Sequence, residues 1–457
     1  MIKETWKKMI GILAISLVTA CGFAFSADAS AVEVKGKLIE EALDAEEFLQ
    51  EFLGDDPASM DGEWQLTDMM DAAMKQMGGF EGMAKSLANL GAVKEIGHAS
   101  EAEQGNNKIY PIPCVFENMN LNLVVSVQAG KLAGLTTAPY TGEEETEAVT
   151  EQAKGFTSVD LAIPVPELDG ELPGTLTLPE GDGPFPAVIL VHGSGPNDRD
   201  ETLMKMKPFK DIADGLTEKG IAVYRYDKRT LVYGSQIAED TSATLEEETI
   251  KDAVAAVQLL AEQEKIDPEH IYVLGHSLGG LAIPAINQEL VKEEVKAAGY
   301  ILLAAPVRRL DEIMREQYDY LYSLMPEVTE EQQEAKDELF AELDKLKDPD
   351  SLADDETVAG AYGHYWKWLI DYDVLATAEE IDVPCLLLQG EEDYQVTDYP
   401  LWEEAFGEKE NWQMKLYPGL VHTFTPGKKS EGNTVYSKEE HVDPEAIDDI
   451  ATFVLEK

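Results

Sequence analysis

A strand-like run in this chain ends abruptly in a turn that holds a serine. Residues 271–274 read Ile-Tyr-Val-Leu, and they are followed by Gly-His-Ser-Leu-Gly at 275–279 and by an apolar helical pattern. The spacing G-x-S-x-G predicts a sharp turn from strand to helix, because so tight a bend leaves no room for Cβ atoms at its glycines. Such a turn lifts the Ser277 hydroxyl above the end of the strand, so the sequence predicts an exposed, reactive serine.

Strands and helices alternate around this turn. Strand-like segments at 185–196, 221–229, 298–307, 383–390 and 411–418 are separated by helical patterns, and several of these segments are apolar on both faces. A strand that is apolar on both faces belongs in a sheet covered on both sides. The alternation therefore predicts an α/β fold with a mostly parallel sheet between two layers of helices.

The 457 residues are too many for one ordinary core and predict two domains. Residues 36–140 show two helical patterns followed by alternating strands, which predicts a small α+β domain. A charged, Gly- and Thr-containing stretch predicts a linker over 141–164. The α/β domain is then expected to span 165–457, with an inserted helical cap at about 308–378.

The N-terminus is typical of an exported protein. Three lysines precede an apolar run at 9–25, and alanines follow at 27 and 29, a pattern that predicts a removable signal peptide over residues 1–29. Within this run, Leu-Val-Thr-Ala-Cys-Gly at 17–22 resembles a bacterial lipobox, in which Cys21 would carry a lipid anchor. Both alternatives place the protein outside the cytoplasm, either secreted or at the cell surface.

Charge and cysteine content exclude some functions. The formal net charge of −53 argues against a nucleic-acid partner, because the phosphate backbone is bound by clustered Lys and Arg. After removal of the signal, Cys114 and Cys385 remain, each in a strand-like stretch, and we expect two separately buried thiols rather than a disulfide. Neither cysteine has a second Cys or His at ligand spacing, so we expect no metal and no cofactor.

A serine hydroxyl needs a base to become a nucleophile, and the base needs a group that orients it. Of the seven histidines, His422 follows the last strand-like run on a loop at its carboxyl end. Asp393 ends the preceding strand-like run and is the expected acid, with its neighbour Glu392 as the alternative. The order serine, acid, histidine predicts a triad of Ser277, Asp393 and His422.

A negatively charged oxygen that forms during acyl transfer must also be held. The backbone N–H of Leu278, just after the serine, is one expected donor. The turn His-Gly-Ser-Gly-Pro at 192–196 is expected to supply the second donor through Ser194. No G-K-[ST] follows these glycines, so a nucleotide site is not expected here.

Five segments together resemble the α/β-hydrolase superfamily, in its bacterial exported esterase branch related to dienelactone hydrolases and acylaminoacyl-type peptidases. They lie at 191–202, 224–230, 275–280, 387–397 and 417–424. The resemblance implies an acyl-enzyme route through the triad. Residues 230–235 depart from it, because related sequences continue with glycine at this point. The segment at 36–140 resembles a small module, cystatin-like in shape, that precedes such hydrolases and implies no chemistry.

Charged and aromatic residues near the site allow two interpretations. Asp227 and Arg229 are expected to form a structural ion pair at a strand end, rather than to take part in chemistry. In the cap, Tyr362, Tyr365 and Trp366 are candidate substrate-binding residues, although they can equally attach the cap to the sheet.

The sequence predicts an exported serine carboxylesterase that acts on small-molecule esters. A serine peptidase or amidase of the same fold is the first alternative, because it would use the same triad. A non-catalytic cell-surface binding protein is the second.

Overall fold

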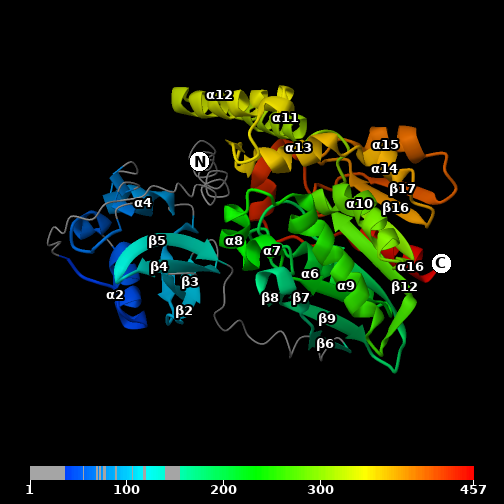
Figure 1. Ribbon diagram of the computed structural model, residues 1–457, viewed down its shortest axis with the longest axis horizontal. Helices are drawn as coiled ribbons and strands as arrows, with labels where there is room; N and C mark the ends of the chain where they lie inside the picture. The colour runs from blue at the N-terminus through cyan, green and yellow to red at the C-terminus, as the bar shows by residue number, and fades with distance from the viewer. Residues whose placement is uncertain are drawn as a thin grey trace. The chain divides into compact units, whose positions relative to one another are not determined.

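The computed structural model describes residues 36–54, 56–67, 70–71, 74–75, 79–87, 90–104, 107–116, 120–138 and 155–456. The chain forms two compact units, whose described parts are 36–138 and 155–456. We call the first the N-terminal unit and the second, which contains the predicted Ser277, Asp393 and His422, the catalytic unit, and each is described by itself (Figure 1). The predicted signal peptide, Cys21 and the first part of the predicted linker lie outside the described residues. Among the described residues, no helix has the length and apolar character needed to cross a bilayer.

The N-terminal unit combines short helices with an antiparallel sheet, as the α+β prediction requires. Its helical segments are α2 (Ala42–Phe52), η2 (Pro57–Met60) and α4 (Gly79–Ser86). Its strands are β1 (Val93–Ile96), β2 (Ala102–Gln104), β3 (Asn107–Phe116), β4 (Asn120–Gln128) and β5 (Lys131–Ala138). The sheet order is β1-β3-β4-β5, and β2 pairs with β3. The cystatin-like shape stays a prediction.

Helix α2 forms because its apolar residues recur on one face. Ala45, Phe48, Leu49 and Phe52 are buried, whereas polar residues occupy the other side. Phe48 lies edge-on to Trp64, with ring centroids 5.4 Å apart. The apolar face of α2 therefore packs into the core of the unit.

The two cysteines that follow the predicted signal are separate buried thiols, as expected. Cys114 lies in β3 of the N-terminal unit and Cys385 begins a strand of the catalytic unit, and both are free. Burial raises the pKa of the Cys114 thiol to about 11. A thiol with so high a pKa is protonated near neutral pH and is a poor nucleophile, so Cys114 is a packing residue.

An eight-stranded sheet forms the centre of the catalytic unit, in the order β17-β16-β13-β12-β10-β11-β9-β6. The six strands from β17 to β11 are parallel, and β9 and β6 are antiparallel additions at one edge. The strands are β6 (Phe156–Asp160), β9 (Gly174–Pro179), β10 (Phe185–Val191), β11 (Ala222–Tyr226), β12 (Ile266–His276), β13 (Gly299–Leu303), β16 (Cys385–Gly390) and β17 (Trp412–Tyr417). This sheet confirms the predicted α/β fold.

The catalytic unit begins earlier than we predicted. β6 lies inside the segment 141–164 that the sequence indicated as a linker, and it pairs with β9 at the sheet edge. β7 (Ile163–Val165) straddles the predicted boundary and pairs with β8 (Gly170–Leu172). An edge strand needs only one apolar face and one partner. β6 buries Phe156 but exposes most of its other residues, so its pattern is too weak to stand out from a linker.

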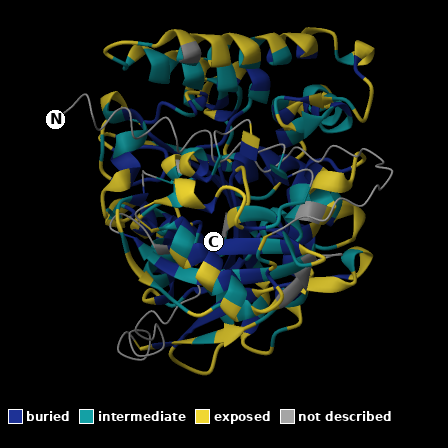
Figure 2. Ribbon diagram, turned by 90° about the vertical axis from the view of Figure 1, so that its left-hand side faces the viewer, coloured by how far each residue is buried: buried dark blue, intermediate teal, exposed yellow. Residues whose placement is uncertain are grey.

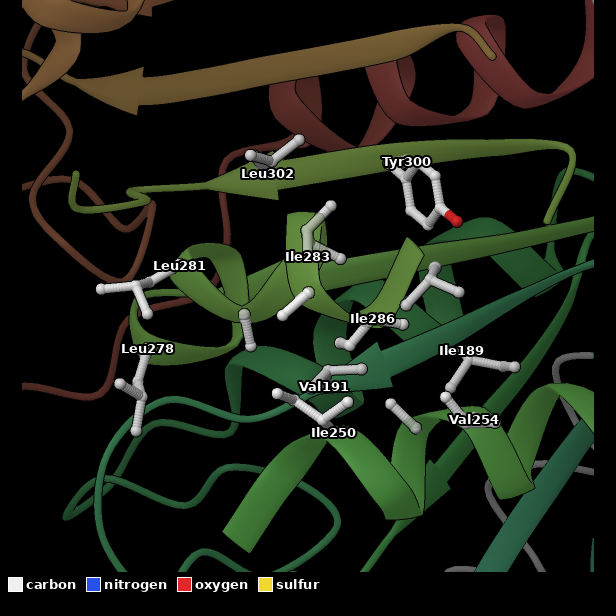
Figure 3. Packing of buried hydrophobic residues seen from close by; sticks show 14 of the residues in the cluster. Ile189, Val191, Ile250, Val254, Leu278, Leu281, Ile283, Ile286, Tyr300 and Leu302 are labelled. Carbon is white, nitrogen blue, oxygen red and sulfur yellow. The ribbon is translucent and has the colours of Figure 1, made fainter. Parts of the chain in front are cut away.

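Helices cover both faces of the sheet. α6 (Pro208–Thr217) and α16 (Pro444–Leu455) pack with one set of strand residues. α9 (Lys251–Ala261) and α10 (Leu278–Lys292) pack on the opposite face, and Figure 3 shows Ile283 and Ile286 of α10 near Ile189 and Val191 of β10. Successive residues of a strand point to opposite faces, so these strands are apolar on both sides.

The insertion between β13 and β16 is helical, as expected for 308–378. Its helices are α11 (Leu310–Ser323), α12 (Glu330–Asp344), α13 (Gly363–Asp371) and α14 (Val374–Ala378), with the small hairpin of β14 (Thr357–Val358) and β15 (Ala361–Tyr362) between them. α12 begins at a capping box formed by Thr329 and Gln332. Most of its surface is exposed, as the upper helix in Figure 2 shows.

Short helical segments complete the catalytic unit. They are η4 (Pro166–Leu168), α7 (Arg229–Val232), α8 (Gly234–Glu239), η5 (Glu246–Ile250), η6 (Lys345–Lys347), η7 (Pro349–Ser351), α15 (Tyr399–Phe406) and η8 (Lys429–Ser437). α7 and α8 occupy the segment at 230–235 whose sequence departs from the hydrolase pattern. Tyr233, between them, receives a hydrogen bond from the Glu171 amide at 2.8 Å, which fixes the segment against β8.

Candidate active site

The predicted turn at Ser277 is present. β12 ends at His276, α10 begins at Leu278, and Ser277 between them has φ 53° and ψ −117°. A positive φ is uncommon for a residue other than glycine, and it is the conformation that a strained strand-to-helix turn imposes on its serine. A Cβ at Gly275 would lie 2.3 Å from the Gly279 carbonyl oxygen, and one at Gly279 would lie 2.3 Å from that of Val191. Both glycines are therefore required by close packing.

His422 and Asp393 are brought together by the loops after β17 and β16. His422 Nδ1 lies 2.7 Å from Asp393 Oδ2, and both side chains are buried. Asp393 also accepts hydrogen bonds from the Gln395 amide at 2.7 Å and from Gln389 Nε2 at 2.8 Å. These donors hold the carboxylate in one orientation, and the carboxylate in turn orients the imidazole.

Glu392, the alternative acid, faces elsewhere. Its Oε2 accepts a hydrogen bond from the Lys429 amide at 3.1 Å, at the start of η8. The structure therefore places Asp393, and not Glu392, against His422.

The loop of His422 lies against the turn of Ser277. His276, the residue before the serine, has its Nε2 3.1 Å from the His422 carbonyl oxygen, and the two imidazole rings are 4.7 Å apart. β12 and β10 are adjacent parallel strands, so the loop after β10 reaches the same edge of the sheet. An ideal Cβ at Gly193 would lie 3.2 Å from Ser277 Cβ. The structure thus gathers three loops at the carboxyl ends of the strands, where α/β proteins bind ligands.

The two predicted oxyanion donors, the amides of Leu278 and Ser194, lie in the turns that follow β12 and β10. Leu278 begins α10, and the first amides of a helix have no acceptor within the helix. In the turn after β10, the Gly193 amide already donates to Glu201 Oε1 at 2.8 Å, so the next amide, that of Ser194, is the candidate. Asn197 Nδ2 donates to the carbonyl oxygens of Gly193 and Ser194, each at 3.1 Å, which holds the turn in shape.

The sequence matches the family described as "Serine aminopeptidase, S33" over residues 184–426, more than half of the chain. It is 37% identical over 371 residues to the esterase EstD of Thermotoga maritima, covering 80% of this chain and 84% of that protein. The chain belongs to this α/β-hydrolase family. The match to EstD is longer than the catalytic unit, so it includes residues that precede Gly155. These relationships confirm the prediction of a hydrolase of the carboxylesterase type.

Solved structures show weaker likenesses to this hydrolase. Est1E of Butyrivibrio proteoclasticus is 18% identical, with a TM-score of 0.42 over 65% of this chain and 99% of that one. An esterase of Pyrococcus furiosus is 17% identical, with a TM-score of 0.42 over 69% and 96% of the two chains. The fold assignment depends on the family match and on the observed sheet order, and not on these low scores.

The candidate cap residues of the hydrolase make contacts with the protein itself. Trp366 is buried and donates from Nε1 to the Val358 carbonyl oxygen at 2.8 Å. The Tyr362 hydroxyl donates to the Ala238 carbonyl oxygen at 2.9 Å. The Tyr362 bond thus attaches the insertion to α8, whereas the Trp366 bond lies within the insertion.

Tyr365 leads to a buried chain of polar groups that the sequence did not predict. Its hydroxyl donates to Glu248 Oε2 at 2.7 Å, and Glu248 Oε1 pairs with Lys228 Nζ at 2.6 Å. Lys228 is almost fully buried and also donates to the Gly193 carbonyl oxygen at 2.8 Å. Burial raises the pKa of Tyr365, with the Glu248 charge adding to the effect, so its hydroxyl stays a donor. This chain links the cap to the oxyanion turn.

Our prediction that Asp227 pairs with Arg229 is wrong. Asp227 binds Arg199 through two oxygens, at 3.0 and 2.8 Å. Arg229 instead pairs with the buried Asp252 of α9, at 2.5 and 3.0 Å. Asp227 lies two positions before Arg229, which begins helix α7 and bonds to Asp252 in α9. Each charge keeps the structural role that we expected, with a different partner.

His192, at the end of β10, is a neutral buried histidine. Burial is the main reason that its pKa falls to about 4, so the ring is uncharged at neutral pH. Its Nε2 lies 2.9 Å from the Asp198 carbonyl oxygen within the same loop. His192 therefore supports its own loop, in agreement with its exclusion as the catalytic base.

Proposed function

We propose that this hydrolase cleaves small-molecule carboxylic esters by a two-step route in which Ser277, His422 and Asp393 act as nucleophile, general base and orienting acid. The hydrogen bond between Asp393 and His422, beside the strained turn of Ser277, is the observation that carries the proposal. The relationship to EstD, which is an esterase, supports the choice of substrate class.

The first step forms an acyl-enzyme. His422 Nε2 takes the proton of the Ser277 hydroxyl while Oγ forms a bond to the ester carbonyl carbon. Asp393 accepts from Nδ1–H and stabilises the imidazolium that results. The amides of Leu278 and Ser194 donate to the tetrahedral oxyanion, and removing one such donor in other hydrolases lowers kcat by about 10²–10³. The intermediate collapses, the bond to the alcohol oxygen breaks, and His422 returns the proton to the leaving alcohol.

The second step returns the free enzyme. His422 takes a proton from water as the water oxygen attacks the acyl carbon, and the same two amides hold the second oxyanion. The bond to Ser277 Oγ then breaks, Oγ regains a proton from His422, and the carboxylic acid leaves. Every proton is moved by His422, so its orientation by Asp393 is needed in both steps.

Fluorophosphonate labelling tests the mechanism. We expect the wild-type protein to be labelled and Ser277→Ala, with an unchanged circular dichroism spectrum, to resist labelling and to lose ester hydrolysis by about 10⁵-fold or more. Labelling that persists in Ser277→Ala contradicts the proposal. A well-folded wild-type protein that is never labelled would instead favour a binding protein.

A serine peptidase or amidase is the second candidate, favoured by the family description "Serine aminopeptidase, S33". p-Nitrophenyl esters of increasing acyl length and aminoacyl-anilides distinguish the two. Amides are harder to cleave, because the leaving amine must be protonated as it departs. We expect kcat/KM for the best ester to exceed that for the best anilide, and the reverse order would establish the peptidase.

Export is part of the proposal. Support comes from the lysines and the apolar run of residues 1–29, and from the lipobox-like sequence around Cys21. Expression of the full chain with and without Cys21→Ser, followed by mass analysis of the mature N-terminus, separates a cleaved secreted form from a lipid-anchored one. An intact N-terminus that stays in the cytoplasm contradicts export.

A further inference from the structure

A buried imidazole lies between two loops of the site without belonging to the proposed triad. The His276 side chain is 7% exposed. Its Nε2 lies 3.1 Å from the His422 carbonyl oxygen, and its Nδ1 lies 2.9 Å from Glu201 Oε2. Nothing near His276 in the sequence indicates these partners.

The partners of His276 determine its protonation. A carbonyl oxygen only accepts, so Nε2 must carry a proton, and Nδ1 faces a carboxylate oxygen. An imidazolium beside a carboxylate fits both contacts, because Nε2–H donates to the carbonyl oxygen and Nδ1 lies at ion-pair distance from Oε2, without hydrogen-bond geometry between these two atoms. Burial alone would lower the pKa of His276, but the Glu201 charge outweighs burial and raises it. Burial likewise would raise the pKa of Glu201, but the charge of His276 and the Gly193 amide lower it.

Glu201 extends these contacts to the oxyanion turn. Its second oxygen, Oε1, accepts the Gly193 amide at 2.8 Å. Glu201 itself has φ 52°, an uncommon conformation for a residue with a side chain, which its contacts must maintain. The contacts therefore run from Gly193 through Glu201 and His276 to the main chain of His422. His276 is also bonded directly to Ser277 along the chain.

We propose that His276 is a positioning residue for ester hydrolysis, which with Glu201 holds the oxyanion turn, the serine turn and the His422 loop in one register. The proposal rests on the function proposed above. A displacement of about 1 Å at a reacting group can cost about 10²-fold in rate, so a group that joins three loops has a measurable effect on kcat. His276 touches no reacting atom and acts only through these loops.

The charges around His276 give the proposal a second readout. Glu201 faces Nδ1 of His276, and the charges of Glu201 and Asp393 both raise the pKa of His276. The ring centroids of His276 and His422 are 4.7 Å apart. A positive charge on His192 would lower the pKa of Glu201. From α6, the ring of Phe209 faces His276, with the two ring centroids 6.4 Å apart. Removing the imidazolium takes away a positive charge whose ring centroid lies 4.7 Å from that of the His422 ring, and the loss of a nearby positive charge makes an imidazole easier to protonate. The acid limb of kcat/KM should then move to higher pH.

His276→Leu is the direct test. We expect kcat for a p-nitrophenyl ester to fall by about 100-fold, KM to stay within about threefold, and the acid limb of kcat/KM to shift to higher pH. Tyr300→Phe is the matched control, because it removes a buried hydrogen bond that Tyr300 of β13 donates to Asn287 of α10. It should leave kcat and the pH profile unchanged. A His276→Leu enzyme with wild-type kcat and an unmoved acid limb overturns the proposal.

Glu201 variants keep the test valid if His276→Leu does not fold. Glu201→Leu should lower kcat by about 100-fold, since it loses both contacts. Glu201→Gln keeps an acceptor for the Gly193 amide and can donate to a neutral His276, so it should retain kcat within about fivefold. Glu201→Gln with a loss as large as that of Glu201→Leu contradicts the proposal.

Ser277→Ala separates this inference from the proposed function. If Ser277→Ala still hydrolyses esters, the triad is wrong. If Ser277→Ala is inactive while the His276 and Glu201 variants match the wild type, only the positioning role is wrong.

Discussion

The N-terminal unit and the catalytic unit bury different kinds of side chain. Among the described residues of the N-terminal unit, Asn122 is the only polar residue that is buried. Its ion pairs, such as that of Lys85 with Glu81, lie at the surface. The catalytic unit instead buries charges, including Arg229 with Asp252 and Glu201 with His276, near the carboxyl ends of its parallel strands.

This difference follows from the two sheets. An antiparallel sheet joined by tight turns can bury one apolar face and leave its loops in water. A parallel sheet brings several long loops together at one edge, where their polar groups lose water and must find partners. Buried charges remain only when they are paired and hydrogen-bonded. The residues of the proposed triad thus lie in the unit that has the parallel sheet.

Among the variants that test this difference between the two units, Asp393→Asn is expected to have the largest effect, which is a loss of kcat. An amide presents the wrong partner to His422 Nδ1 and favours the wrong tautomer, so we expect kcat to fall by about 10⁴-fold. Steady-state ester hydrolysis measures the loss. Glu392→Gln is the control, because Glu392 bonds to the Lys429 amide instead, and it should retain kcat. Equal losses in both variants would contradict the assignment of Asp393.

Phe48→Ala tests whether the N-terminal core is independent of the chemistry. Phe48 is fully buried and contacts Phe52, Trp64 and Phe80, so its truncation should destabilise the N-terminal unit by about 3 to 5 kcal/mol. Calorimetry and limited proteolysis follow this unit. Ser277, Asp393 and His422 all belong to the catalytic unit, so kcat should stay at the wild-type value, and a parallel loss of kcat would show that the units are coupled.

Asp252→Asn tests the cost of breaking a buried pair. Arg229 would keep its charge in a buried site with only Glu167 as a charged partner, and we expect a loss of about 3 kcal/mol in the free energy of unfolding of the catalytic unit. Chemical denaturation measures it. Asp344→Asn, in an exposed pair with Arg315, should have little effect. Similar costs at both positions would show that burial is not the deciding factor.

The pair of Glu201 and His276 predicts a pH window of stability. The pKa of Glu201 is lowered, so its contribution is present above its ordinary value of 4.5 and is lost as pH falls through the lowered value. The pKa of His276 is raised, so its contribution is present below 6.5 and is lost as pH rises through the raised value. The stability difference between wild type and Glu201→Gln should be largest between pH 4.5 and 6.5, at on the order of 1 kcal/mol.

Denaturation of both proteins below, inside and above this window, at about pH 4, 5.5 and 8, measures how the stability difference changes with pH. A difference that is flat across these pH values would show that the pair carries no net charge interaction.

The sequence by itself determined the features that depend on local geometry and chain order. The strand-to-helix turn at Ser277 follows from the glycines at 275 and 279, since a Cβ at either would overlap backbone atoms. Parallel strands place the ends of β12, β16 and β17 at one edge, so loops that follow strand-like runs could be predicted to meet. The α/β fold and the residues 277, 393 and 422 could therefore be chosen from the chain alone.

Only the tertiary structure decided which distant groups become partners. Asp227 and Arg229 are near neighbours in the sequence but bind Arg199 and Asp252. Glu201 and His276 meet because β10 and β12 lie side by side, although they are 75 positions apart in the sequence. The edge strand β6 and the internal contacts of Trp366 are likewise set by packing. A side chain in a buried site takes the partner that satisfies its charge in three dimensions, and no local pattern in the sequence encodes that choice.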